Sequence, residues 1–257
     1  MCTVGFAYEY PTSNEYKLVV VENFCGEDPY IFHIFSSDVG IWQEFQWTTS
    51  FGDYVNFQSR SFYLNHTLYW LMKDGRVLAF DTNQKYARIL KSSLEVIKQH
   101  VDLPGDKIFH HDSWFGVVQG KLHLVWALKN YVVVVTYDDE INSWEVVHIN
   151  NNFLTGLTSD CYRYGRPLWI NNNKWTLLFL LVHPFSKDGT IYEYDFETRQ
   201  NRKIIDVPVM KNPRSQIFVP LVPTLAKVKK THLDSLSNIT EITKALDKLK
   251  QLFNLDN

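Results

Sequence analysis

Residues 61–81 read SFYLNHTLYWLMKDGRVLAFD, and this stretch decides the fold. We interpret residues 61–72 as one strand, Asp74-Gly75 as a short turn, and residues 77–81 as a second strand that ends at an acidic turn. An Asp-Gly pair between two apolar runs is a strong hairpin signal, because both residues tolerate the left-handed backbone of a tight turn. We therefore expect an all-β chain in which this hairpin is the repeating element.

The second half of the hairpin occurs three more times, as an apolar run, an aromatic residue and a polar or acidic turn. A four-stranded propeller blade takes roughly 40–50 residues, and loop insertions lengthen individual blades. The pattern therefore predicts a β-propeller of about four to six irregular blades. A two-sheet sandwich of the same strands stays open, because strand order cannot be read from hydrophobic patterning. The aromatic residues that end the third strand of each unit are Phe35, Phe80, Tyr137 and Tyr194, spaced by 45, 57 and 57 residues.

Apolar runs bounded by turn residues place the strands of each unit. In the first half of the chain the pattern predicts strands at 4–8, 15–21, 30–35, 42–47, 61–72, 77–81 and 86–90, and a short helical turn at 94–99. In the second half it predicts strands at 114–118, 121–126, 131–137, 143–147, 167–170, 175–182, 190–195 and 203–205, and an edge strand interrupted by prolines at 216–225.

The period changes near the C-terminus. Apolar residues then recur every three or four positions with lysines between them, which predicts an amphipathic helix. This helix either packs against the blades or docks on a partner. We expect two regions, a propeller-like domain at 1–228 and a helical tail at 229–257. The apolar positions of the tail are Ile239, Ile242, Leu246, Leu249 and Phe253.

Composition narrows the possible partners and compartments. Of the 257 residues, 45% are hydrophobic and 15% aromatic, and the formal net charge is -2, so we expect no nucleic-acid partner. The longest apolar run, residues 175–182, is too short to span a bilayer, so we expect no membrane partner. Cys2, Cys25 and Cys161 form no CxxC pair, which favours a reduced intracellular compartment, the cytoplasm or the nucleus.

Few residues have the arrangement that catalysis needs. His110 and His111 are adjacent, so on a strand they point to opposite faces and do not readily share a metal ion. Acidic residues follow three of the predicted third strands, at Asp81, Asp138 and Asp195, where they suit turn geometry better than acid-base chemistry. We therefore expect no catalytic residue, no metal site and no cofactor.

Two aromatic-rich loops suit protein interfaces, where tyrosine, tryptophan and arginine dominate binding energy. They cover residues 46–57 and 162–166. Aromatic side chains folded back over blade edges are an equal alternative for any one residue. The partner-binding candidates are Trp47, Tyr54, Phe57, Tyr162, Arg163, Tyr164 and Arg166.

Short motifs run through the chain in a recognisable order. They are Gly5-Phe6-Ala7-Tyr8 with PTSNEYKLV at 11–19, Phe35-Ser36 with Trp42, NHTLYWL at 65–71 with VLAFD at 77–81, and Leu103-Pro104 with GKL at 120–122 and Ser143-Trp144. In order and spacing they resemble the F-box-associated domain of plant F-box proteins, a degenerate kelch-like propeller. The resemblance covers roughly residues 4–225. Two departures are His66, where the family has glycine, and the pair Glu9-Tyr10 before Pro11.

The resemblance implies a function in ubiquitin-dependent degradation. In such proteins the F-box binds a Skp1-like adaptor of a cullin-RING ligase, and the propeller binds the protein to be degraded. The F-box helices do not occur in this sequence, so the resemblance implies only the target-binding half, with the adaptor as a partner if a longer form supplies an F-box. We expect a non-catalytic module for substrate recognition, with a protein target that the sequence does not identify. The alternative is a propeller that binds or hydrolyses glycans.

Overall fold

The computed structural model describes residues 2–8, 14–22, 29–48, 57–72, 74–101, 113–128, 131–155, 157, 165–171, 173–182 and 188–208. These residues form sixteen strands and one short helix. The predicted edge strand at 216–225, the helical tail and the domain boundary after residue 228 lie outside them. No helix in the described part of the chain is long and apolar enough to cross a membrane.

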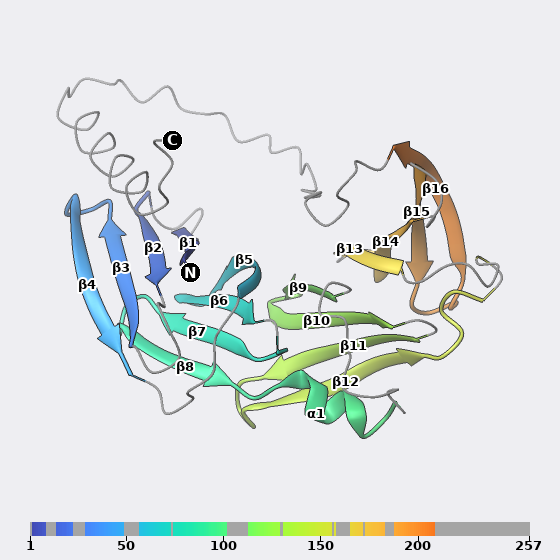
Figure 1. Cartoon of the computed structure of the whole chain (residues 1–257), viewed down its shortest axis with the longest axis horizontal. Coiled ribbons are helices and arrows are strands. Elements are labelled where there is room, and N and C mark those ends of the chain that lie inside the picture. Colours follow the sequence, from blue (N-terminus) through green and yellow to red (C-terminus); the bar gives the residue numbers. More distant parts are fainter. Residues whose placement is uncertain are drawn as a thin grey trace. The chain divides into compact units, whose positions relative to one another are not determined.

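The strands form four sheets of four strands each, and in every sheet the strands follow one another in chain order (Figure 1). The structure is therefore nearly all-β, and the four predicted repeats are confirmed. The first sheet holds β1 (Cys2–Tyr8), β2 (Tyr16–Glu22), β3 (Tyr30–Ser36) and β4 (Ile41–Trp47), and the second holds β5 (Phe57–Leu64), β6 (Thr67–Met72), β7 (Val77–Asp81) and β8 (Tyr86–Leu90). The third holds β9 (Ser113–Val118), β10 (Lys121–Leu128), β11 (Tyr131–Asp138) and β12 (Ser143–Asn150), and the fourth holds β13 (Gly165–Asn171), β14 (Thr176–Val182), β15 (Asp188–Asp195) and β16 (Asn201–Pro208).

The chain divides into two compact units. Among the described residues, the first unit holds 2–69 and 80–87, and the second holds 70–79 and 88–208. The second sheet therefore contributes strand residues to both units.

The opening stretch contains three strands where the pattern predicts two. Residues 61–72 divide between β5 and β6, and the break is a two-residue turn at Asn65 and His66, whose φ angles are 47° and 63°. Two left-handed residues in a row make the type I′ turn that suits the twist of a hairpin. The prediction of one strand is wrong here, because Asn65 and His66 turn the chain between β5 and β6. Asparagine and histidine are among the non-glycine residues that adopt a left-handed backbone most readily.

The turn between the third and fourth strands repeats the same chemistry in three sheets. Asp81 Oδ1 accepts hydrogen bonds from the backbone N–H groups of Asn83 and Gln84, at 2.8 and 2.7 Å. The carboxylates of Asp138 and Asp195 accept two backbone N–H groups in the same way. The predicted turn role of these acids is confirmed. Four residues after the strand end the backbone is left-handed in every sheet, at Gly40, Lys85, Asn142 and Arg199.

Each unit has an aromatic core. In the first unit the rings of Phe32 and Phe80 stack with their centroids 4.4 Å apart. In the second unit Phe153, Phe179 and Tyr194 belong to one buried cluster between the third and fourth sheets. The four aromatic residues predicted to end the third strands each lie one position before the strand's last residue and are buried.

The single helix of the described residues is α1 (Ser93–Lys98), where the sequence predicts a helical turn. The Ser92 side chain caps its first turn by accepting a hydrogen bond from the Leu94 backbone N–H. The indole N–H of Trp126 on β10 donates to Ser93 Oγ at 3.3 Å, which ties the helix to the third sheet. The helix also lies close to β12 (Figure 1).

Candidate functional site

The partner-binding residues predicted from the sequence fall in different parts of the structure. Trp47 is the last residue of β4, and its ring lies 5.7 Å from that of Tyr30. Phe57 is the first residue of β5 and is buried. Arg166, on β13, is half-buried and belongs to the second unit, whereas Trp47 and Phe57 belong to the first. Tyr54, Tyr162, Arg163 and Tyr164 lie outside the described residues.

Sheet topology separates two kinds of connection. In a sheet whose four antiparallel strands follow chain order, the first and third connections lie at one end and the second lies at the other. We call the end with the first and third connections the turn end. The predicted loops at 46–57 and 162–166 connect one sheet to the next. The fourth strand of a sheet ends, and the first strand of the next sheet begins, at the sheet end away from the turn end, so these two loops are attached there.

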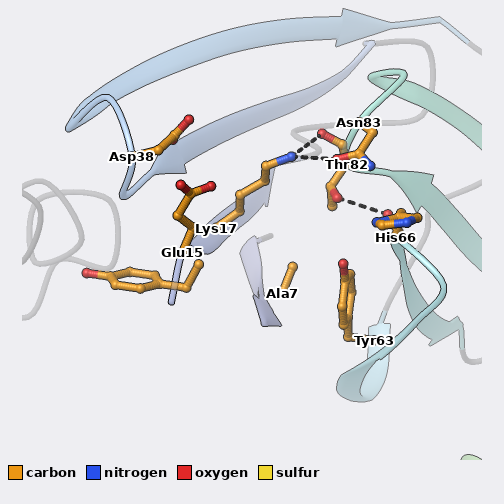
Figure 2. A pocket seen from close by; sticks show the side chains of 9 residues that line it. Ala7, Glu15, Lys17, Asp38, Tyr63, His66, Thr82 and Asn83 are labelled. Carbon is orange, nitrogen blue, oxygen red and sulfur yellow. Dashed lines mark hydrogen bonds between the residues drawn. The ribbon is translucent and has the colours of Figure 1, made fainter. Parts of the chain in front are cut away.

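The first unit has a pocket at its turn ends, of about 130 Å³ (Figure 2). It is mostly polar in composition and brings together β1, the start of β2 and three turns. Its lining residues are Ala7, Glu15, Tyr16, Lys17, Asp38, Tyr63, His66, Thr82 and Asn83.

Lys17 is the central cation of this pocket. Its Nζ donates to the backbone carbonyl of Thr82 at 3.0 Å and to Asn83 Oδ1 at 2.8 Å (Figure 2). The Thr82 hydroxyl in turn donates to the His66 carbonyl oxygen at 2.9 Å. Hydrogen bonds from Lys17 therefore link β2 to the β7–β8 turn. The hydrogen bond from Thr82 links that turn to the β5–β6 turn.

The pocket has little capacity for a small-molecule substrate. Small-molecule sites typically measure roughly 300–1,000 Å³, well above the volume found here. The two lining carboxylates belong to Glu15 and Asp38, whose side chains lie on the far side of Lys17 from Asn83 (Figure 2). In the described part of the chain, no group of three or more His, Cys, Asp or Glu side chains is arranged to hold a metal ion.

Burial shifts the pKa values of several titratable groups toward their uncharged forms. Burial raises the pKa of the Cys2 thiol to about 11, with a further contribution from the Glu22 carboxylate, so this thiol is a poor nucleophile. Burial lowers the pKa of His148 to about 4 and raises the pKa of Tyr194. These shifts favour the uncharged forms that suit a packed interior.

Exposed apolar side chains recur at the turn ends of three sheets, and the sequence patterns did not indicate them. Val39 and Ile41 in the first sheet, Tyr86 in the second and Ile141 in the third are between 50% and 58% exposed. All four lie within the β3–β4, β7–β8 and β11–β12 turns or begin the strand that follows. In sequence such residues look like the start of a strand, so only their distance from the preceding third strand could have identified them.

Comparisons with known proteins give no family for this chain. No protein-family model matches it, and no curated protein matches it. An S. cerevisiae complex of Dbp5 with Nup159, Gle1, IP6 and ADP is structurally similar at 12% identity and TM-score 0.41, covering 78% of this chain and 60% of the other. Hydrazine synthase of Kuenenia stuttgartiensis is similar at 15% identity and TM-score 0.40, covering 73% and 46%. An oligogalacturonate lyase in complex with manganese is similar at 11% identity and TM-score 0.35, covering 76% and 63%.

These similarities define neither a family nor an activity for the chain. The chain spans less than two thirds of each of these three proteins.

Proposed function

We propose that this chain is a non-catalytic protein-binding module that contacts its target through the turn ends of its sheets. The observation that carries the proposal is the recurrence of exposed apolar residues at the equivalent turn of three successive sheets. Single exposed apolar residues are normal on protein surfaces, but their recurrence at the equivalent turn of three sheets favours a binding role for these turns.

The polar groups at the same turns support binding over catalysis. The carboxylates of Asp81 and Asp138 each accept two backbone N–H groups, so they are used to shape the turns. Lys17 is held by two oxygen acceptors. Rigid turns with exposed apolar side chains suit recognition, because little conformational entropy is lost when such side chains are buried by a partner.

The four sheets are in this proposal the blades of a kelch-like β-propeller. Chain-order sheets of four strands are the unit from which propellers are built. The sequence motifs resemble the F-box-associated domain, and that resemblance supports a target in ubiquitin-dependent degradation. A Skp1-like adaptor would join only through an F-box supplied by a longer form, in the cytoplasm or the nucleus.

The test is affinity purification of the chain from cell extract, alone and fused to an F-box, with co-purified proteins identified by mass spectrometry. We expect both forms to retain the same target protein, and the fused form to retain a Skp1-like adaptor and a cullin as well. The variants Val39→Ser, Tyr86→Ser and Ile141→Ser, combined in one chain, should reduce target recovery by about tenfold or more, the change that a loss of 1.4 kcal/mol produces.

The matched control is the double variant Val147→Ser and Ile205→Ser. These residues are 46% and 54% exposed but lie within strands β12 and β16. The control should retain the target, and circular dichroism should show that both variants keep their β structure. Equal recovery by the turn variant and the wild type would contradict the turn ends as the binding surface. Binding to a glycan array without any retained protein would overturn the protein-binding proposal.

A further inference from the structure

Two turns of the first unit carry both the polar pocket and exposed apolar side chains. The β3–β4 turn supplies Asp38 to the pocket lining, and the next residue, Val39, is exposed. The β7–β8 turn supplies Thr82 and Asn83 to the lining, and Tyr86, directly after this turn, is exposed. A partner that covers these apolar side chains therefore lies beside the pocket.

A hydrogen bond links β4 to the turn before β8. Lys85 Nζ donates to Gln43 Oε1 at 2.6 Å, and Tyr86 follows Lys85 in the chain. Ile41 lies two positions before Gln43, so both side chains point to the same face of β4. The bond therefore holds the starts of β4 and β8, and with them the exposed side chains of Ile41 and Tyr86, near each other.

Asp38 differs from the turn carboxylates of the other three sheets. Each of those accepts two backbone N–H groups of its own turn. The β3–β4 turn is held by Ser37 instead, whose hydroxyl accepts from the Tyr16 N–H at 2.8 Å and whose N–H donates to the Tyr16 carbonyl at 3.0 Å. In the part of the chain that the structure describes, the exposed carboxylate of Asp38 has no hydrogen bond and no ion pair. Its acceptor capacity is therefore open to a ligand.

The charge of the pocket favours a cation over an anion. Its lining holds the carboxylates of Glu15 and Asp38 and the ammonium of Lys17, a formal net charge of -1 when histidine is counted as neutral. The ammonium donates to neutral oxygens of Thr82 and Asn83, and the two carboxylates lie on its far side from Asn83 (Figure 2). A cation on the carboxylate side is attracted by both acids, whereas an anion there is repelled by both.

The volume of the pocket suits one side chain of a partner. It is about 130 Å³, whereas small-molecule sites start at roughly 300 Å³. Lysine and arginine side chains have an apolar stem and a charged end, so they can lie along apolar surface while the charge reaches a carboxylate. Val39, next to Asp38, supplies such apolar surface at the β3–β4 turn.

The second unit repeats the combination of acidic and apolar exposure at one turn. In the β11–β12 turn Asp139 and Glu140 precede Ile141, and all three side chains are exposed. Asp139 pairs with Arg88 at 3.0 Å, whereas the Glu140 carboxylate has no partner among the described residues. A basic and apolar partner is therefore complementary to the turn ends of either unit.

We propose that the target presents to the first unit a segment in which a lysine or arginine lies next to apolar residues. The basic side chain enters the pocket and binds the carboxylate of Asp38, and its apolar neighbours cover Val39 and Tyr86. This inference rests on the proposed function, because it names the chemistry of the segment that the turn ends bind.

Selection from a random peptide library displayed on phage tests the chemistry of the segment. The wild-type chain should enrich sequences with lysine or arginine next to apolar residues, and Asp38→Asn should lose the preference for the basic residue. Glu145→Gln is the matched control, because it removes an exposed carboxylate of β12 outside the turns, and it should enrich the same sequences as the wild type. Enrichment of aspartate and glutamate would instead indicate an anion beside Lys17 and would overturn the inference.

Fluorescence anisotropy of one selected basic peptide measures the contact with Asp38. Asp38→Asn should weaken binding about two- to fivefold, the range of a partly exposed ion pair, and the difference should shrink in high salt. Glu145→Gln should leave the affinity unchanged. Circular dichroism should show that Asp38→Asn keeps its β structure, since Asp38 takes no part in the hydrogen bonds of its turn. Equal affinities of the wild type and Asp38→Asn would contradict the inference.

The variant that combines Val39→Ser, Tyr86→Ser and Ile141→Ser separates this inference from the proposed function. If the wild type enriches peptides that this variant does not bind, but without basic residues, the proposed function stands and the basic segment is wrong. If both chains enrich the same peptides, or neither enriches any, the turn ends are not the binding surface and both proposals fail.

Discussion

His148 and Tyr194 meet between the third and fourth sheets, where His148 Nε2 on β12 lies 3.0 Å from the hydroxyl oxygen of Tyr194 on β15. The side-chain amide of Asn150 donates to the same hydroxyl at 2.8 Å. The hydroxyl therefore accepts from the amide and can donate to a neutral imidazole. This polar group lies among the apolar side chains that fill the core of the second unit, including Phe153 and Phe179.

Removal of the Tyr194 hydroxyl should destabilise the chain. Tyr194→Phe keeps the ring but leaves Asn150 Nδ2 and His148 Nε2 without this partner in a largely buried setting. The expected loss is about 1–3 kcal/mol in the free energy of unfolding, measured by urea denaturation. Tyr86→Phe, at an exposed turn, serves as the control and should change stability by less than about 0.5 kcal/mol. Equal losses in the two variants would show that the hydroxyl of Tyr194 is not used structurally.

Acid should weaken the same interface through His148. Burial, with Arg199 nearby, lowers the pKa of His148 to about 4 in the folded chain, against about 6.5 when unfolded. Above pH 6.5 both states hold a neutral imidazole. Between pH 6.5 and 4 the unfolded chain takes up a proton that the folded chain does not, so stability falls as the pH is lowered.

The size of this acid effect can be isolated by substitution. The loss should reach about 1–2 kcal/mol near pH 4, once solvent screening of a partly exposed group is discounted. His148→Gln should show a smaller loss over the same range, measured by urea denaturation at several pH values. Burial also lowers the pKa of His123, so His123 contributes to the pH dependence of stability in the wild type and in His148→Gln alike. Identical pH profiles would contradict the assignment to His148.

The repeat was predictable because its signals are local. An aromatic residue followed by an acidic turn reflects a buried strand end and a carboxylate that accepts turn N–H groups, as at Tyr137 and Asp138. The Asn65-His66 turn escaped prediction because its left-handed geometry is set by the pairing of β5 with β6, and histidine carries no strong turn signal.

The candidate site was less predictable than the fold. The sequence indicates which loops are rich in aromatic residues, but exposure depends on which face of a strand another sheet covers. Phe57 is buried at the start of β5, whereas Tyr86 is exposed at the start of β8, although both are aromatic residues at strand ends. The contact of Lys17 with Asn83 joins residues 66 positions apart, and periodicity carries no information on such a pair.

Two glycines offer a test of backbone strain against crowding. Gly75 and Gly120 both have left-handed backbones, with φ of 80° and 75°. A methyl group at Gly75 would lie 3.1 Å from Leu94 Cγ, whereas a methyl group at Gly120 would meet nothing within 4 Å. Gly120→Ala should therefore cost only the strain of a left-handed alanine, about 1 kcal/mol.

Gly75→Ala should cost more than Gly120→Ala, about 2 kcal/mol or more, because Leu94 and the Ser92 hydroxyl, 3.1 and 3.2 Å from the added methyl group, must also move. Urea denaturation of both variants checks the order of the two losses. In a Leu94→Ala background, Gly75→Ala should cost less than it does in the wild type, because the contact with Leu94 is gone and only the contact with the Ser92 hydroxyl is left. An equal loss at the two glycines would show that the contact with α1 relaxes at no cost.

Lys17 and Asn83 should be energetically coupled, because Lys17 Nζ donates to Asn83 Oδ1 at 2.8 Å and the two residues join β2 to the β7–β8 turn. Lys17→Met removes the ammonium but keeps most of the side chain's length, and Asn83→Ala removes the acceptor. A double-mutant cycle in urea denaturation should give a coupling energy of about 0.5–1 kcal/mol, typical of an exposed hydrogen bond to a charged group. Lys85→Met with Asn83→Ala is the control cycle, since Lys85 Nζ bonds to Gln43 instead, and its coupling should be close to zero. A coupling near zero in the Lys17 cycle would mean that the bond to the Thr82 carbonyl alone holds the lysine in place.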